Sequence, residues 1–344
     1  MRHDSPASRT AGAVLGVILL TAALAAQSPP RGRFVDDAGR TVQLPAQVTR
    51  VFAAGAPADV LLYTLVPDKL PGRNRVPAAD VLDFHPPAYR TPVLIRQLPD
   101  RDDASADAEL LALKPSIYID YGSVHEDYAA SVAAIQKRTG IPGIILDGRL
   151  DRIPSVYRRL GPALGAAARG EHLSAASERI LTTYRGALTT AKVRVYMACS
   201  SDGFVPCLAD DTAAEQLALL GAINVAGTAA AAPRRPRTID EIRAMVPDVI
   251  VMTGQGAAAR LRANPEWQTV DAVARGRVLQ FPGIPDSWGS RPPSVNRLAG
   301  VIWLARALPN RPLDAAFRDE VRAFYSTFYH VDLTDQQLQR LLPQ

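Results

Sequence analysis

The chain has 344 residues, of which 47% are hydrophobic and 21% charged, and its formal net charge at pH 7 is +5. This length is sufficient for two domains with sizeable cores. The basic residues are scattered except at Arg234–Arg237, and no aromatic residues are interleaved with them. The charge pattern therefore argues against a nucleic-acid-binding protein.

The chain begins with a pattern typical of an export signal. Arg2 and Arg9 precede an uncharged apolar run from Ala11 to Ala26, with small residues around Ala25. At about 16 residues the run is shorter than the ~20 that a membrane-spanning helix needs. We therefore expect residues 1–26 to be a signal peptide cleaved near Ala25, and the mature protein to be a periplasmic monomer that does not span the membrane.

Two segments outside the repeated units have distinct patterns. Phe34–Val48 alternates apolar and polar residues around an Asp-Ala-Gly turn, which predicts a β-hairpin. Gly72–Asp103 is rich in proline, arginine and aspartate and has no periodicity. A long irregular loop of this kind either binds a ligand or simply runs over the surface.

The two halves of the chain repeat one order of helices and strands. The best match is between ELLALKPSIYIDYG and EIRAMVPDVIVMTG, where a short helix ends at proline and an apolar strand ends at glycine. Near-continuous apolar strands of this kind are typical of parallel sheets covered on both faces. The repeated segments are Arg50–Gly55, Ala108–Gly122 and Gly140–Gly148, then Lys192–Gly203, Ala213–Gly227, Asp240–Gly254 and Ala274–Gly283.

A single long helix is predicted between the two repeats. From Arg169 to Thr190 the apolar residues recur every three or four positions. We therefore predict an α/β fold with two Rossmann-like lobes, residues 34–166 and 192–344, whose sheets are mainly parallel. One helix over residues 167–191 joins the lobes, and helices at the C-terminus cover a lobe.

The chain carries none of the common catalytic motifs. It has no GxSxG, HExxH, CxxC, Walker or GxGxxG sequence, so we do not expect an enzyme. Its five histidines lack ligand spacing, and we expect no resident metal. Cys199 and Cys207 are the only cysteines, and in an exported protein this pair indicates a disulfide that pins the loop between them.

In two facing α/β lobes, a ligand lies beyond the carboxyl ends of the strands. Aromatic rings and guanidinium groups at these ends suit a planar anion. The aromatic rings of Tyr121 and Trp288 could instead pack in the core and not bind a ligand. Arg149 could instead form an ion pair with Asp147 or Asp151. The candidate ligand-binding residues at the strand ends are Tyr121, Ser123, Arg149, Ser201, Asp202, Gln255, Trp288 and Arg291.

Several segments, in their order along the chain, resemble the periplasmic substrate-binding proteins of ABC importers for iron complexes, haem, cobalamin and some oxyanions. They are LALKPSIYIDYG, TGIPGIILDGRL, LGPALG, VPDVIVMTG and WGSRPPSVNRLAGVIWLA. The resemblance covers nearly all of the mature chain. It implies delivery of a ligand to a membrane permease that works with ATPase subunits.

The resemblance also implies that one acidic residue on each lobe docks the permease. In the second lobe the matching position is Asp240, which also suits the first turn of a helix. In the first lobe the matching position is Ala108, so the neighbouring Glu109 or Asp107 is the candidate.

The identity of the ligand stays open at this point. We favour a ferric siderophore, because ferric catecholates and hydroxycarboxylates carry negative charge and flat rings. The alternatives are molybdate or tungstate bound by amides, serines and arginines, or haem or cobalamin. Two other classes remain: an exported enzyme of similar shape, and a metal-ion scavenger using His85 and His125.

Overall fold

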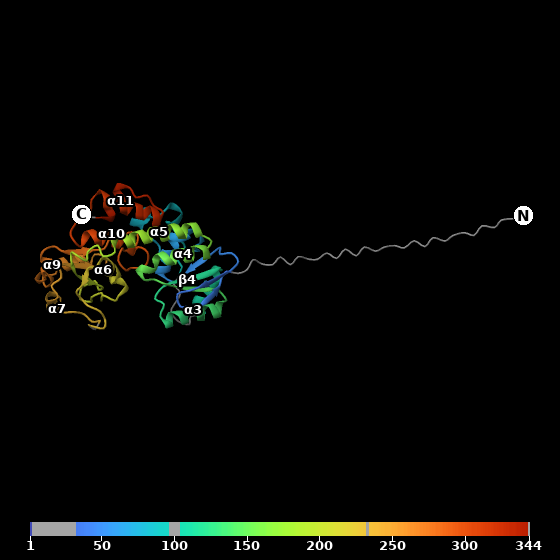
Figure 1. Ribbon diagram of the computed structural model, residues 1–344, viewed down its shortest axis with the longest axis horizontal. Helices are drawn as coiled ribbons and strands as arrows, with labels where there is room; N and C mark the ends of the chain where they lie inside the picture. The colour runs from blue at the N-terminus through green and yellow to red at the C-terminus, as the bar shows by residue number, and fades with distance from the viewer. Residues whose placement is uncertain (2–31, 96–103, 232–233, 343–344) are drawn as a thin grey trace.

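The computed structural model describes residues 1, 32–95, 104–231 and 234–342. Apart from Met1, the predicted signal peptide lies outside these residues. The described chain forms two lobes, each built on a parallel sheet, and the prediction of an α/β fold with parallel-rich sheets is confirmed (Figure 1).

The first lobe begins with the predicted hairpin and continues into a parallel sheet. In the hairpin the opposed side chains of Phe34 and Val42 are both buried. The sheet has the order β3-β4-β5, and β5 is buried along its whole length. The strands are β1 (Arg33–Val35), β2 (Thr41–Gln43), β3 (Val51–Ala53), β4 (Ile117–Gly122) and β5 (Gly143–Asp147). The helices are α1 (Ala56–Leu65), α2 (Ala104–Leu113), α3 (Glu126–Thr139) and α4 (Ile153–Ala163).

The second lobe contains a four-stranded sheet in the order β7-β6-β8-β9, with every neighbouring pair parallel. Its central strand β8 is buried at all positions, in agreement with its unbroken apolar sequence. The strands are β6 (Arg194–Ala198), β7 (Ile223–Asn224), β8 (Val249–Met252) and β9 (Val278–Gln280). The helices are α6 (Glu215–Leu220), α7 (Ile239–Ala244), α8 (Ala257–Ala263) and α9 (Asp271–Ala274).

The helix between the two lobes in sequence is α5 (Ala167–Tyr184). It ends before the predicted Thr190, and a turn with Gly186 at φ 70° follows. Helix α5 packs closely on α4, where Gly161 and Gly170 bring the two backbones together. In Figure 1 it lies at the centre of the molecule, between α4 and α10.

The C-terminal segment contacts both lobes. It contains α10 (Arg297–Ala307), α11 (Ala315–Phe324), a π-helical turn (Tyr325–Tyr329) and α12 (Asp335–Leu341). The Tyr63 hydroxyl on α1 donates to the Tyr329 carbonyl at 3.2 Å, and the Gln337 amide donates to the Asp83 carbonyl at 2.7 Å. The segment that ends the chain is therefore part of the packing of the first lobe.

The described part of the long loop predicted after α1, residues 72–95, is irregular apart from short 3₁₀ turns, and residues 96–103 of that loop lie outside the described chain. It is closed by a bridge between Arg73 and Leu94, so that its ends lie side by side. The 3₁₀ turns in this region are η1 (Pro67–Lys69), η2 (Ala79–Phe84) and η3 (Pro87–Tyr89).

Candidate ligand-binding site

A cavity of about 580 Å³ lies between the loop that follows α1 and the loop that follows β9. Its volume is within the range of small-molecule sites, roughly 300–1,000 Å³. Both lobes contribute polar side chains, and the C-terminal segment contributes Leu341 and Leu342. The polar residues in the cavity wall include Arg73, Arg75, Asp80, His85, Gln255, Gln280, Asp286 and Arg340.

Arg73 is held in the wall by a buried ion pair. Its Nε donates to Asp59 Oδ1 at 2.7 Å, and the two residues are 7% and 3% exposed. Its guanidinium carbon lies 4.3 Å from the centre of the Tyr63 ring, a cation–π contact. Burial raises the pKa of Asp59, and the charge of Arg73 opposes this change. Each partner thus compensates for the burial of the other.

Arg75 connects the two lobes across the cavity. Its side chain, 56% exposed, forms an ion pair with Asp286, whose side chain is 2% exposed. The Tyr329 hydroxyl also donates to the Asp286 carboxylate at 3.1 Å. A buried carboxylate of the second lobe therefore accepts hydrogen bonds from the first-lobe loop and from the C-terminal segment.

His85 adds a neutral polar group to the same wall. Its Nδ1 lies 3.3 Å from the Tyr63 hydroxyl. Burial, together with the positive charge of Arg73, lowers the pKa of His85 to about 4. The imidazole is consequently uncharged near neutral pH, so the positive charge of the wall comes from the arginines.

Two aromatic residues predicted to face a ligand are instead part of the core. Tyr121 is 1% exposed and Trp288 is 0% exposed. The Trp288 indole donates to the Tyr325 hydroxyl at 3.1 Å. Neither ring offers a face to the cavity, so the interpretation of these residues as ligand-binding plates is wrong for this structure. The alternative of core packing describes them correctly.

The polar strand-end residues of the first lobe lie on the surface. Ser123 is exposed, and Arg149 pairs with Asp147, with Nη2 and Oδ2 2.7 Å apart. The side-chain hydrogen bond from Arg149 and its charge lower the pKa of Asp147 despite partial burial of the carboxylate. Among the eight candidates, all of them in the described part of the chain, Gln255 alone lines the cavity.

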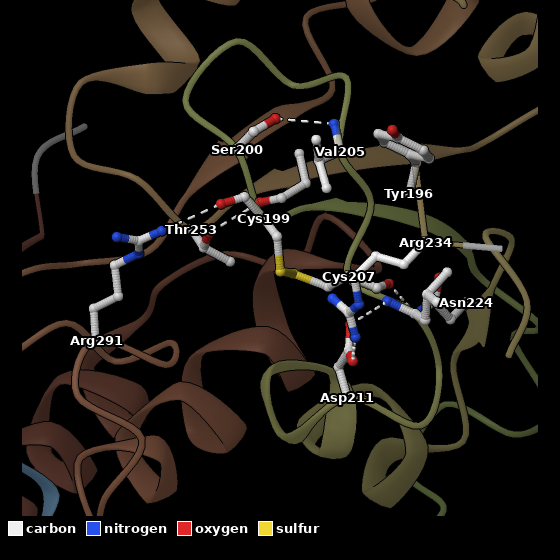
Figure 2. The surroundings of a disulfide bond; sticks show 12 residues. Tyr196, Cys199, Ser200, Val205, Cys207, Asp211, Asn224, Arg234, Thr253 and Arg291 are labelled. Atoms are coloured by element: carbon white, nitrogen blue, oxygen red, sulfur yellow. Dashed lines mark hydrogen bonds and ion pairs between the residues drawn. A yellow bond between two sulfur atoms is a disulfide. The ribbon is translucent and has the colours of Figure 1, made fainter. Parts of the chain in front are cut away.

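The remaining candidates are Arg291, which lies near the disulfide in Figure 2, and Ser201 and Asp202, which belong to the loop between its two cysteines. Cys199 and Cys207 are bonded, with their Cα atoms 5.0 Å apart. Arg291 points toward this loop, where its Nη2 donates to the Cys199 carbonyl at 3.3 Å. Ser201 and Asp202 are exposed within the loop. The disulfide thus fixes a polar turn beside β6, outside the wall of the cavity.

The two candidate docking residues are both exposed at helices. Asp240 lies in the first turn of α7, between the capping-box residues Thr238 and Glu241, and Arg243 donates to it at 2.8 Å. Glu109 lies on α2. The candidate positions are therefore accessible to a partner, one on each lobe.

Within the described residues, no helix is both long enough and apolar enough to cross a membrane. In the same part of the chain, no three side chains of histidine, cysteine, aspartate or glutamate converge in a way that would hold a metal ion.

The structure is similar to solved periplasmic binding proteins along most of its length. An ABC transporter solute-binding protein from Sulfurospirillum deleyianum superposes with a TM-score of 0.76 at 22% identity, covering 91% of this chain and 99% of that one. The molybdate-binding periplasmic protein MolA of Haemophilus influenzae gives 0.68 at 18% identity, covering 88% and 99%. The vitamin B12-binding protein BtuF of Vibrio cholerae gives 0.54 at 19% identity, covering 76% and 97%.

The chain has the fold of periplasmic solute-binding proteins. The neighbours are named as solute-binding or periplasmic binding proteins and not as enzymes. No family model and no curated protein matches the sequence.

The sequence missed Asp59, Arg73 and Arg75 as residues of this site. Arg73 and Arg75 lie in the arginine-rich loop for which the sequence allows a binding role, but nothing in its pattern distinguishes them from the other arginines there. Their importance follows from contacts between residues distant in sequence, above all from the pairing of Arg75 with Asp286.

Proposed function

We propose that this protein is the periplasmic solute-binding component of an ABC importer, which captures a small-molecule ligand and delivers it to a membrane permease. The observation that carries the proposal is the cavity of about 580 Å³ between the two lobes, with arginines in its wall. The fold supports the same role, because the neighbours of known name are transport binding proteins.

A ferric siderophore is the ligand that we propose. Ferric catecholates and ferric hydroxycarboxylates are anionic, and Arg73, Arg75 and Arg340 supply positive charge in the wall. The volume suits a ligand of drug size better than a single oxyanion. Tyr121 and Trp288 no longer support the choice of a siderophore, since their rings are buried and cannot stack on a ligand.

Molybdate or tungstate is the second candidate. One neighbour of this fold is named for binding molybdate. A wall rich in guanidinium groups and poor in accessible aromatic rings also suits an oxyanion.

Native mass spectrometry of the mature protein, purified gently from the periplasm of its own cells, tests the proposal. A bound mass of several hundred daltons with an iron isotope pattern is expected. A bound mass near that of one oxyanion would instead favour molybdate or tungstate. A protein that carries no small molecule, from cells grown under either iron or molybdate limitation, would contradict the proposed function.

We further propose that Asp240 and Glu109 dock the permease. They are exposed, acidic and carried by helices of different lobes. Reversing both charges with Asp240→Arg and Glu109→Arg should reduce uptake of the ligand by cells while leaving its affinity for the purified protein unchanged. Uptake equal to that of the wild type would exclude these residues from docking.

A further inference from the structure

The arginines in the cavity wall differ in how their hydrogen-bonding capacity is used. Arg73 is 7% exposed, and its Nε is bound to Asp59. Its Nη1, however, is buried and has no hydrogen-bond acceptor among the described residues. A buried charged donor without an acceptor is unfavourable, so this guanidinium retains an unfilled site for an acceptor.

Arg75 presents the opposite situation. Its side chain is more than half exposed, and its guanidinium donates to the Asp286 carboxylate and to the Pro285 carbonyl of the other lobe. The Asp286 carboxylate is buried, is bound by Tyr329, and is close enough to Arg73 to interact with it electrostatically. One internal carboxylate therefore lies where two arginines of the cavity wall meet.

We propose that Arg73 and Arg75 together bind an anionic group of the ligand, and that this group replaces Asp286 as the partner of Arg75. The inference rests on the proposed function and adds to it the charge of the ligand and the residues that recognise it. The group is a carboxylate or an oxyanion, because the planar fork of arginine matches the paired oxygen atoms of both.

The geometry assigns different roles to the two arginines. Arg73 is anchored by Asp59 inside its own lobe, so its position does not depend on the ligand. Arg75 bridges the lobes, and an anion that becomes its new ion-pair partner breaks the ion pair with Asp286. Binding of the anion would then exchange one contact between the lobes for a contact through the ligand.

Asp286→Asn gives the sharpest test. The amide has nearly the shape of the carboxylate and keeps an oxygen for the Tyr329 hydroxyl, but it removes a negative charge next to both arginines. An anion should therefore bind the variant more tightly than it binds the wild type. If Asp286 itself held a cation or a ligand donor, the same substitution would weaken binding.

The experiment is isothermal titration calorimetry at low ionic strength with sodium molybdate, sodium citrate and ferric citrate as probes. At least one probe should bind the wild type. Arg73→Gln should then weaken its binding roughly 10- to 100-fold, as expected for the loss of a charge-assisted hydrogen bond. Arg158→Gln, a substitution on the outer surface of α4 where the arginine pairs with Glu171 and Glu178, should leave binding unchanged.

Three results with these probes would overturn the inference. They are a wild type that binds none of the probes, an Arg73→Gln variant that binds as the wild type does, and an Asp286→Asn variant that binds more weakly. Arg73→Lys keeps a cation opposite Asp59 and serves in place of Arg73→Gln if that variant does not fold, as judged by circular dichroism. A ligand found by native mass spectrometry and retained equally by all variants would reject this inference and leave the transport role intact.

Discussion

His85 is a neutral side chain in a wall where the neighbouring cations oppose its protonation. Its pKa in the folded protein is about 4, against about 6.5 in an unfolded chain. Below pH 6.5 the unfolded chain therefore takes up a proton that the folded protein does not, and stability falls until the pH reaches about 4. At ~1.4 kcal/mol per pH unit, this one residue accounts for a loss of about 3 kcal/mol.

We expect His85→Gln to reduce the loss of stability between pH 6.5 and 4. Glutamine does not titrate, and its amide can still reach the Tyr63 hydroxyl. The measurement is the free energy of unfolding in urea at several pH values, for the wild type and the variant. If the free energies of unfolding of the wild type and the variant fell equally with pH over this range, His85 would be protonated in the folded protein.

Single residues were the hardest part of the site to predict. Tyr121 lies at the end of a strand, but its ring points into the core, since alternate side chains of a sheet covered on both faces are buried on either side. Trp288 follows β9 in a loop, and its burial depends on Tyr325, which is distant in sequence. Sequence position indicates where a strand ends, but it does not tell which of the residues there face a ligand.

At the scale of elements, α4 and α5 are in contact through glycines. A Cβ atom added at Gly170 would lie 2.8 Å from the Gly161 Cα and 2.7 Å from the Tyr157 carbonyl oxygen. These are backbone atoms of a neighbouring helix, so the helices must separate to admit a methyl group. Gly170→Ala should lower the free energy of unfolding by about 1–3 kcal/mol.

Chemical denaturation measures this loss, with Gly32→Ala as the matched control. A Cβ atom at Gly32 would meet only the end of the Leu44 side chain, at 3.5 Å. Equal stability of the two variants would mean that α4 and α5 are not packed as closely as described.

The disulfide between Cys199 and Cys207 closes a short loop after β6. A cross-link of this kind stabilises a protein chiefly by restricting the unfolded chain, and a loop of this size contributes about 2–3 kcal/mol. The double substitution Cys199→Ser with Cys207→Ser should therefore lower the free energy of unfolding by this amount. The affinity for the ligand should be little changed, because the loop lies outside the cavity.

Unfolding in urea and ligand titration of the same double variant separate the two effects. A large loss of affinity at full stability would indicate that the loop, including Arg291, contacts the ligand. In that case the original interpretation of Ser201, Asp202 and Arg291 as binding residues would be favoured.

At the scale of the whole molecule, Arg297 joins the two lobes from a fully buried position. It pairs with Glu215 at 2.8 Å and also donates to the carbonyl of Gly148, in the first lobe. Glu215 in turn accepts from the backbone of Leu150 at 2.6 Å. This ion pair therefore connects the end of β5 to α6 and α10.

Arg297→Met should be strongly destabilising, because it removes the partner of Glu215 and four donated hydrogen bonds from the interior. We expect a loss of roughly 3 kcal/mol, at the low end for a broken buried ion pair, since Glu215 keeps some contact with water. The midpoint of urea unfolding gives the measurement, and Arg306→Met, on the partly exposed side of α10, is the control.

The overall architecture was far more predictable than the site. The repeated order of helix, proline, apolar strand and glycine predicts both sheets, because each unit carries its own local signals. The pairing order within a sheet and the return of the C-terminal segment to α1 depend on packing between distant parts of the chain. No local pattern around Tyr329 or Gln337 indicates their first-lobe partners.

The return of the C-terminal segment also determines how the protein can be dissected in the laboratory. A fragment cut at α5 would leave the first lobe without Tyr329 against Tyr63, and without Arg340 and Gln337 on the Asp83 turn. Such a fragment would expose aromatic surface and would be prone to aggregate. Work on an isolated first lobe would therefore require residues 315–342 to be supplied as a separate peptide or fused to it through a linker.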